Sequence, residues 1–449
     1  MIKIVTPDNN KQERKYILDI IFNEFLGLEY ILEYKKDFEF WQIELENGKK
    51  IKFKDSFFNK FPNELEYLKL ENIPDKVEFV TNKFLAEEDI PMIYGSSDIK
   101  VFNDEIVCGI DIFASGFFML TRWEEYVNKN RDSHDRFPAY ESLAYKQGFL
   151  DRPVVNEYLE MLKNMMIGLD EELEFKKRKF EFILTHDVDH IYKWDTPKKF
   201  IRHLCGDIIL RKSFKEFFKS ILYYIKVRIK IVNDPYDTFD YLMNVSEKIG
   251  TKSYFFFMAE GLTNFDNRYK TDDKIVVELF NKIKSRGHYI GIHPTYNAYN
   301  DKSQFKNEKK ELEENFGVKI SFGREHYLRF ELPNTWQIWE DNEMQWDSTL
   351  GYADKEGFRC GVCYPYSVFN VLTQKKLNLK EKPLIVMDGS LKEQKNMNST
   401  LMTEKILKLI KKTKKYNGEF VFLWHNSSFN VCEWREYNVS YESAIIEIA

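Results

Sequence analysis

Residues 181–190 read EFILTHDVDH, and this stretch predicts both a buried strand and a reactive site. Its apolar core is typical of a strand that is covered on both faces in a parallel sheet. Asp187 and Asp189 are two residues apart, so in an extended chain both carboxylates point to the same face. One carboxylate of such a pair can bind a metal while the other takes a proton from water. The same pair can also cap a turn, so further residues are needed to decide.

Six further segments share this pattern of an apolar run, and helical patterns lie between them. They are residues 252–258, 288–293, 320–326, 344–349, 383–389 and 420–426. Most of the seven runs end in a polar residue, namely Asp187, His293, His326, Asp347, Asp388 and His425. Strands that alternate with helices predict an α/β fold, and we favour a barrel over an open sheet. Because barrel enzymes carry their chemistry at the carboxyl ends of the strands, these polar residues predict an active site there.

The first part of the chain has a different pattern. Short β-like runs near Glu44, Lys50 and Lys76 mix with a helical pattern around residues 63–70. The charged run EELEFKKRKF at residues 171–180 then separates this part from the strands described above. We therefore predict a smaller α+β domain over residues 1–175 and a β/α barrel over residues 176–449.

Residues 196–235 form a basic insertion between the first two predicted strands of the barrel. Lys, Arg and aromatic residues alternate there at helical spacing, which predicts helices. Such helices can bind a membrane surface or an anionic lipid-linked substrate. They can equally form a helix pair that packs on the barrel with a solvated basic face, and both interpretations stay open.

The composition excludes several classes of protein. A net charge of -5 over 449 residues argues against a nucleic-acid partner, because binding of that kind requires neutralisation of phosphates. Five thinly spread cysteines do not form a disulfide framework, and Cys360 and Cys363 lack the second pair that structural zinc requires. The opening residues carry charges throughout, and no later run reaches membrane-spanning length. We predict a cytoplasmic protein with reduced thiols.

Several residues beyond the first strand could carry chemistry. Neutral imidazole is a common metal ligand, and His293 stands at a strand end, although a lone histidine is more often a hydrogen-bonded core residue. Arg324 or Arg329 could hold a catalytic carboxylate ionised by paired hydrogen bonds. His425 could protonate a leaving amine. Side chains suited to lining a sugar pocket are Arg324, His326, Trp346 and Asp347.

Taken together, five segments resemble the polysaccharide deacetylase family, carbohydrate esterase family 4. They are THDVD (185–189), GHYIGIH (287–293), RFELP (329–333), WDST (346–349) and FLWHN (422–426). The resemblance implies the distorted seven-stranded β/α barrel of the NodB-homology domain, with a divalent metal, most often zinc, as cofactor. The segment at residues 109–126 resembles domains that accompany divergent bacterial deacetylases and implies no function.

The resemblance also implies roles for single residues. In the FDVD variant of the family's first motif, Asp187 corresponds to the catalytic base and Asp189 to a metal ligand. Arg329 corresponds to the arginine that orients the base, and His425 corresponds to the catalytic acid. The Trp346–Asp347 pair corresponds to the fourth motif.

The second family motif is H-x-x-x-H, in which both histidines bind the metal. This chain has His293 at the first position and Asn297 at the second. An asparagine carbonyl is a harder and weaker ligand than imidazole, so we expect a lower affinity for zinc or a preference for another divalent ion.

The resulting hypothesis is a metal-dependent hydrolase that removes N-acetyl groups from amino sugars of a bacterial glycan or its precursor. Two alternatives stay open. The chain could be a glycan-binding or scaffold protein on a barrel that has lost its metal, or it could hydrolyse small amides or cyclic ureides.

Overall fold

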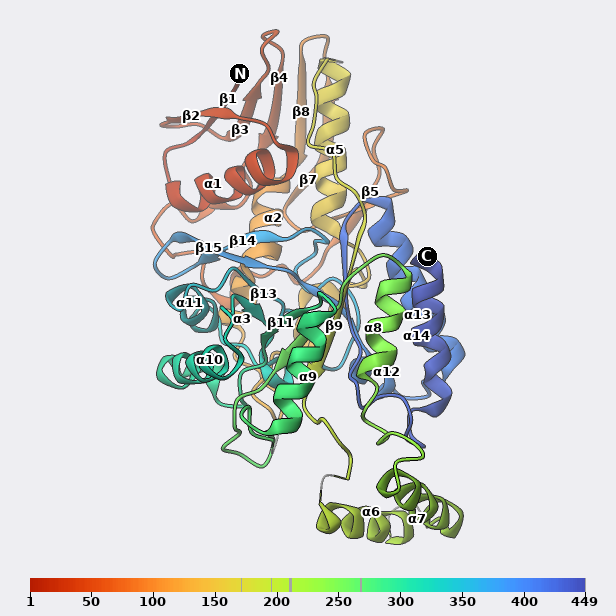
Figure 1. Cartoon of the computed structure of the whole chain (residues 1–449). Helices are drawn as coiled ribbons and strands as arrows, with labels where there is room; N and C mark the ends of the chain where they lie inside the picture. Colours follow the sequence, from red (N-terminus) through yellow and green to blue (C-terminus); the bar gives the residue numbers. More distant parts are fainter. Residues whose placement is uncertain (171, 195, 210–211, 267–268, 449) are drawn as a thin grey trace. The chain divides into compact units, whose positions relative to one another are not determined.

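The computed structural model describes residues 1–170, 172–194, 196–209, 212–266 and 269–448, which divide into two compact units (Figure 1). The first unit comprises Met1–Glu181, Tyr327–Ile385 and Lys411–Phe420. The second comprises Phe182–His326, Val386–Ile410 and Val421–Ala449. The domain boundary that we predicted at residue 175 stays a prediction.

The first unit is built around a six-stranded mixed sheet with the order β2-β1-β3-β4-β8-β7. Its strands are β1 (Ile2–Pro7), β2 (Tyr30–Lys35), β3 (Phe40–Glu44), β4 (Lys50–Lys54), β7 (Gly95–Val101) and β8 (Glu105–Ile110). A short antiparallel pair joins β5 (Glu78–Val80) to β6 (Ile90–Met92). The strands β14 (Tyr366–Asn370), β15 (Lys375–Glu381) and β13 (Trp346–Asp347) are neighbours in that order.

The helices of this unit are mostly short. They are α1 (Lys11–Leu18), α2 (Ile112–Thr121), α3 (Trp123–Val127), α4 (Leu143–Lys146), α5 (Val154–Leu169) and α11 (Asn334–Asp341). Every residue of α2 is buried, as its apolar sequence IFASGFFMLT requires. The helix predicted around residues 63–70 is wrong. Instead, Leu65 has a left-handed backbone and the side chain of Asn63 donates to the Glu66 carboxylate, which makes a turn.

The second unit contains the strands that carry the predicted site. β9 (Glu181–Val188), β10 (Tyr254–Phe257), β11 (Tyr289–Ile292) and β12 (Phe322–Gly323) pair in parallel in the order β12-β11-β10-β9. β17 (Glu419–Leu423) and β16 (Leu384–Met387) end in this unit and continue the order beyond β9. All residues of β9 after Glu181 are buried, which explains its continuous apolar core.

β11 and β12 approach each other at two glycines. A Cβ atom on Gly323 would lie 1.9 Å from the carbonyl oxygen of Ile292, and one on Gly291 would lie 2.5 Å from that of Phe322. Real side chains cannot adopt such contacts, so glycine is required at both positions. The close approach places Arg324, directly after β12, with its N–H on the Ile292 carbonyl at 3.1 Å.

Helices follow the strands of this unit in alternation. They are α8 (Phe239–Lys248), α9 (Lys274–Ser285), α10 (Lys302–Phe316), α12 (Asp388–Lys392), α13 (Ser399–Lys415) and α14 (Asn438–Ile448). In α9 the buried residues are Val276, Leu279, Phe280 and Ile283, the spacing of one helical face. The side chain of Asp301 caps α10 by accepting from two backbone N–H groups, and Gly317 ends it in the left-handed conformation.

The predicted basic insertion contains two helices that lie against each other, α6 (Pro197–Ile209) and α7 (Phe214–Arg228) (Figure 1). Residues 210 and 211 of the insertion lie outside the described residues. None of the described helices has both the length and the apolar character that a bilayer span requires.

The structure confirms a mixed α/β fold rich in parallel strands. Each of the seven runs predicted as strands overlaps one, and β14 and β15 are additional strands that we did not predict. A closed seven-stranded barrel and a separate N-terminal domain stay predictions.

Candidate active site

Polar side chains gather where the parallel strands of the second unit end. Asp187 is the penultimate residue of β9 and Asp189 directly follows β9, while His293 directly follows β11. Arg324 and His326 come just after β12, and His425 comes two residues after β17. Because β9, β10, β11 and β12 run in parallel, their carboxyl ends meet at one edge of the sheet. Residues that are far apart in sequence therefore come into contact.

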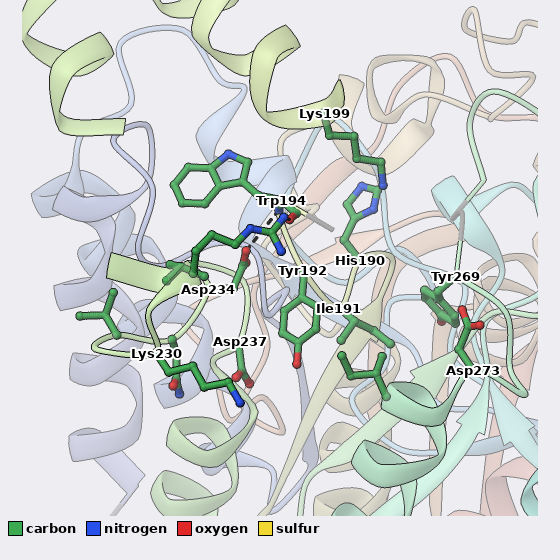
Figure 2. Close-up of a pocket in the computed structure, with 15 residues that line it drawn as sticks. His190, Ile191, Tyr192, Trp194, Lys199, Lys230, Asp234, Asp237, Tyr269 and Asp273 are labelled. Carbon is green, nitrogen blue, oxygen red and sulfur yellow. Dashed lines mark hydrogen bonds between the residues drawn. The ribbon is translucent and has the colours of Figure 1, made fainter. Parts of the chain in front are cut away.

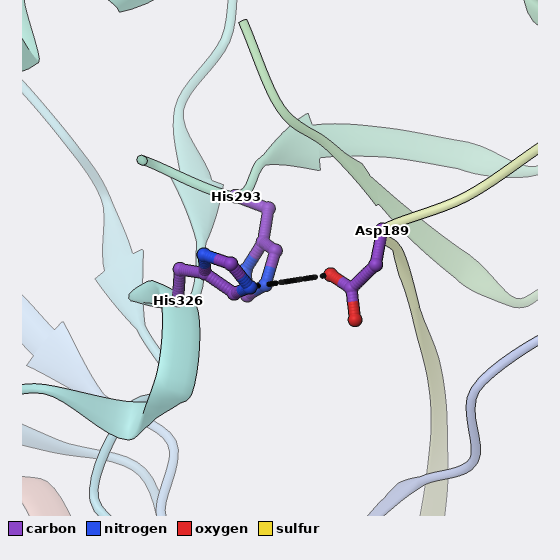
Figure 3. A group of neighbouring side chains, drawn as sticks. All are labelled: Asp189, His293 and His326. Atoms are coloured by element: carbon purple, nitrogen blue, oxygen red, sulfur yellow. Dashed lines mark ion pairs between the residues drawn. The ribbon is translucent and has the colours of Figure 1, made fainter. Parts of the chain in front are cut away.

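Asp189, His293 and His326 form a compact group of candidate metal ligands (Figure 3). One ligand atom from each residue lies within 4.8 Å of the other two. The Nε2 atom of His293 is 3.3 Å from Asp189 Oδ1, and the Nε2 atom of His326 is 3.7 Å from the same oxygen. Both imidazoles therefore present the same type of nitrogen to one carboxylate.

The surroundings of the two histidines fix which nitrogen is available. His293 Nδ1 lies 2.7 Å from the carbonyl oxygen of Arg324, which can only accept, so Nδ1 carries the proton. His326 Nδ1 faces Asp266 Oδ1 at 3.5 Å. A hydrogen bond from the far nitrogen to a carbonyl or carboxylate is the usual way in which a protein orients a metal-binding histidine. The Nε2 lone pairs are thus left for a shared ligand.

Two further observations fit a divalent cation. Within the described part of the chain, the buried Oδ1 atom of Asp189 accepts no hydrogen bond, although two imidazoles face it. Burial lowers the pKa of His326 despite the opposing effect of Asp266, which favours the neutral form that binds metals. Burial raises the pKa of Asp189, but the imidazoles of His293, His326 and His425 more than offset this and hold it well below its usual value. Burial would lower the pKa of His293, but the Asp187 and Asp189 carboxylates raise it, so an ion bound here would displace a proton from Nε2. A carboxylate oxygen and two imidazole nitrogens form a donor set that suits zinc and similar ions.

Asp187 lies beside this group and is held by an arginine. Its Oδ1 atom accepts from Nη1 of Arg324 at 2.8 Å, and its Oδ2 atom is 3.9 Å from His293 Nε2. Both Asp187 and Arg324 are buried. A guanidinium at this distance fixes the orientation of a carboxylate by a charge-assisted hydrogen bond, as a general base requires.

His425 completes the cluster from the other side of Asp189. Its Nε2 atom is 3.7 Å from Asp189 Oδ2, and its Nδ1 atom is 2.7 Å from Asp388 Oδ1. The second oxygen of Asp388 accepts the backbone N–H of His425 at 2.9 Å. Burial would lower the pKa of His425, but the Asp388 carboxylate, followed by Asp189 and Asp187, raises it to about 10. His425 is therefore a cation at neutral pH and can act as a proton donor.

The structure thus brings six of the predicted site residues together, namely Asp187, Asp189, His293, Arg324, His326 and His425. Arg324, which we assigned to substrate binding, contacts Asp187, whereas Arg329 donates from Nε to the His134 carbonyl at 2.9 Å. His326, also assigned to substrate binding, stands among the candidate ligands. Asn297 is exposed just before the short helix Ala298–Asn300, and its role as a ligand stays a prediction.

Arg329, Trp346 and Asp347 belong to the first unit. Trp346 and Asp347 form β13 and are buried. Asp347 Oδ1 accepts from the backbone N–H of Thr349 at 3.0 Å, which shapes the turn after β13. Their roles in substrate binding stay predictions.

Asp266 and Asp388 are the polar partners that the sequence analysis did not assign. Asp388 had a signal, because it ends the apolar run at residues 383–389 at a strand end. Asp266 had none, because it lies in irregular chain between β10 and α9. Its place next to His326 follows from the fold alone. Burial favours the protonated form of Asp266, but the nearby His326 lowers its pKa well below its usual value.

A cavity of about 510 Å³ begins at His190, the residue after Asp189 (Figure 2). Its wall includes the rings of His190, Tyr192 and Trp194 and the cations Lys199, Arg228 and Lys230. Asp234 accepts the backbone N–H groups of Lys193 and Trp194 at 2.7 and 3.2 Å, which fixes the stretch that carries these rings. Aromatic rings and cations therefore line a cavity in the stretch of chain that follows β9.

Comparison with known proteins gives limited similarity. Residues 2–170 match a family of unknown function, DUF7033. Among curated proteins, none matches the chain significantly. A crystal structure assigned provisionally as a polysaccharide deacetylase from Mycobacterium smegmatis is 15% identical, with a TM-score of 0.38, and the match covers 61% of this chain and 85% of that one. The structure of Puue allantoinase is 12% identical, with a TM-score of 0.32, and the match covers 46% of this chain and 64%, just under two thirds, of that one. At these values neither likeness assigns an activity to this chain.

Proposed function

We propose that this chain is a metal-dependent hydrolase of carbon–nitrogen bonds that removes N-acetyl groups from amino sugars. The observation that carries the proposal is the convergence of three kinds of group at one sheet edge. They are a donor set for a cation (Asp189, His293, His326), an arginine-held carboxylate (Asp187) and a cationic imidazole (His425). Metal-dependent hydrolysis of an amide uses all three kinds, because the ion polarises the carbonyl, water must lose a proton and the leaving amine must gain one.

Each residue has a defined task in this reaction. A divalent cation held by Asp189, His293 and His326 would supply Lewis acidity to the amide carbonyl and to water. Asp187 accepts the proton of the attacking water, since Arg324 fixes the orientation of this carboxylate. His425 donates its Nε2 proton to the leaving nitrogen while Asp388 holds Nδ1. The aromatic rings of the cavity beside β9 offer faces on which a sugar ring can stack.

The third ligand distinguishes this proposal from the family pattern. We infer that His326 takes the place that Asn297 was predicted to fill, because its Nε2 atom faces Asp189. With a third strong ligand available, the alternative of a metal-free scaffold protein loses its main motivation, which was the missing second histidine of the motif.

The test combines metal binding with activity. Purified full-length protein, its Asp187→Asn variant and its His326→Gln variant would be equilibrated with zinc, dialysed and analysed for bound metal. Release of acetate would be assayed on oligomers of N-acetylglucosamine. We expect about one ion per chain for the native protein. Asp187→Asn should keep the ion and lose turnover, whereas His326→Gln should lose affinity for the ion by about 10- to 100-fold or more.

Asn297→Ala is the matched control, because this side chain is exposed, and it should leave metal binding unchanged. Absence of bound metal in the native protein, or full activity of Asp187→Asn, would contradict the proposal. Hydrolysis of a cyclic ureide in place of the sugar amide would keep the chemistry and change the substrate class.

A further inference from the structure

Helix α7 presents a row of large apolar side chains to solvent. Their exposed fractions are 70% for Phe214, 62% for Phe218, 61% for Leu222, 49% for Ile225 and 60% for Ile229, which follows the helix. Single exposed apolar residues are ordinary on protein surfaces, but a continuous row of five is not. The row therefore indicates a surface that binds a partner.

The row occupies one side of the helix. At about 100° per residue, its five members fall within an arc of about 80°. Lys215, Lys226 and Lys219 fall within the next arc of about 60°, so they border the row along its whole length. All three lysines are exposed. This arrangement, an apolar stripe bordered by lysines, is typical of helices that lie in the interface of a membrane.

Packing fixes the orientation of α7 against α6, so the row cannot turn inward. The ring of Tyr224 stacks on Phe200 of α6 with centroids 3.7 Å apart and planes inclined by 9°. The hydroxyl of Ser220 donates to Asp207 of α6 at 2.8 Å. Tyr224 and Ser220 lie on the side of α7 away from the row, which leaves the row exposed while α6 is in place.

Helix α6 also exposes apolar side chains and lies in a positively charged segment. Ile201, Ile208 and Ile209 are 60%, 41% and 68% exposed. Over residues 196–235, ten Lys and Arg stand against three Asp and Glu, although the whole chain carries a net charge of -5. Positive charge is therefore concentrated in the segment that also exposes the apolar side chains.

We propose that α6 and α7 form a membrane-docking helix pair that binds the surface of an anionic phospholipid bilayer. The apolar row enters the boundary between headgroups and acyl chains, and the lysines pair with anionic headgroups. A second copy of this chain is a poorer occupant, because all three lysines lie on one side of the row and two rows packed antiparallel would bring them together. The proposal is independent of the hydrolase chemistry, and it places the cavity lined by Lys199, Arg228 and Lys230 beside the bilayer surface.

Vesicle co-sedimentation of the full-length protein tests the proposal. The vesicles would contain equal parts of phosphatidylglycerol and phosphatidylcholine, with pure phosphatidylcholine vesicles for comparison. We expect binding to the anionic vesicles that weakens as salt is raised, since screening acts on the lysine contribution. Weak or absent binding to pure phosphatidylcholine is expected for the same reason.

Two variants separate the apolar and the charged contributions. Phe218→Ser with Leu222→Ser should reduce binding to anionic vesicles by at least about tenfold, because it removes the centre of the row. Lys215→Gln with Lys219→Gln and Lys226→Gln should reduce binding by about fivefold for each lysine removed. The matched controls, Ile446→Ser and Lys274→Gln with Lys310→Gln, change similarly exposed residues of other helices and should bind like the native protein.

No sedimentation with anionic vesicles at low salt would overturn the proposal, as would equal binding of native protein and variants. Sedimentation equilibrium provides a second measurement on the same samples. A dimer that dissociates in the Phe218→Ser, Leu222→Ser variant, together with no vesicle binding, would assign the row to self-association instead.

Discussion

The imidazole of His425 lies between two carboxylates that serve different purposes. Asp388 is buried and accepts from both the ring Nδ1 and the backbone of His425, so it fixes the ring and stabilises its charge. Asp189 faces Nε2 and belongs to the candidate ligand group. Nε2 is therefore the nitrogen that can exchange a proton with a substrate.

Asp388→Asn should lower the pKa of His425 from about 10 toward its ordinary value of 6.5. The reason is that the neutral amide no longer stabilises the imidazolium by charge, while burial continues to favour the neutral ring. NMR titration of the histidine ring protons in metal-free protein measures this shift directly. His288, whose neighbours are Glu247, Lys252 and Arg286, is the internal control and should titrate as before. An unchanged pKa for His425 would mean that Asp388 does not control its charge.

At the scale of elements, the short strand β12 determines where two residues of the site lie. It comprises only Phe322 and Gly323 in the described chain, and it pairs with β11 through Ile292 and Gly323. The two residues that follow it most closely in the site, Arg324 and His326, depend on this pairing for their positions. The glycine contact between the strands is thus a condition for the site.

Gly323→Ala should destabilise the protein by about 1–3 kcal/mol, because the new methyl group would overlap the Ile292 carbonyl and push β12 away. Metal affinity should fall with it, since His326 moves with the strand. Urea unfolding and zinc titration measure the two effects. Gly168→Ala in α5 is the control, because its methyl group would meet Phe84 at an ordinary 3.9 Å, and it should leave stability unchanged or raise it by up to about 1 kcal/mol. Equal behaviour of the two variants would refute this role of β12.

The elements that the sequence predicted best are the buried strands. β9 and its six counterparts were found because a strand covered on both faces reads as an apolar run between turns. The same reasoning placed Asp187, Asp189, His293 and His425 at strand ends, where the structure brings them together.

The partners of these residues could not be predicted in the same way. The choice of Arg324 over Arg329 for Asp187, and the position of His326 beside Asp189, depend on how irregular chain leaves β12. The family spacing directed attention to Asn297, which is close to His293 in sequence but exposed. Asp266 contacts His326 across 60 residues of sequence, and no local pattern encodes such a contact.

At the scale of the whole molecule, the candidate ligands come from segments that meet only in the folded chain. Asp189, His293 and His326 are contributed by the ends of three different strands. A cation that binds this group binds the native state and not the unfolded chain, so it must stabilise the fold.

Zinc at about 100 times its dissociation constant should raise the free energy of unfolding by about 2.7 kcal/mol. Thermal unfolding with zinc and with a chelator measures the shift. His326→Gln should lose most of this shift, and Asn297→Ala should retain it. If the melting temperature of the native protein is the same with zinc and with the chelator, no stabilising ion binds at this group.

A buried ion-pair network in the first unit makes the free energy of unfolding depend on pH. Glu125 accepts from Arg359 Nη2 at 2.5 Å and from Arg122 Nε at 2.9 Å. Burial would raise the pKa of Glu125, but Arg359 and Arg122 lower it from 4.5 to about 2. Because the folded-state pKa lies below the unfolded value, this stabilisation is full above about pH 4.5 and is lost as the pH falls toward 2.

Glu125→Gln should therefore lower the free energy of unfolding by about 3 kcal/mol at pH 7, and the difference from the native protein should shrink as the pH falls below about 4.5. Urea unfolding at several pH values checks both statements. Glu124→Gln is the matched control. Burial raises the pKa of Glu124 to about 6 despite Arg122, so its charge adds no such stability and its replacement should cost less at pH 7. A pH-independent loss in Glu125→Gln would mean that shape, and not charge, accounts for the effect.

Arg324 contacts two residues of the site, one through its side chain and one through its backbone. Its guanidinium holds Asp187, and its backbone carbonyl orients His293. A change of side chain at this position can remove the first link while the second survives, since every amino acid carries the carbonyl. Under the proposed hydrolase function, a descendant of this protein could lose its base by one substitution, keep the group that holds the ion, and become a receptor for the former substrate.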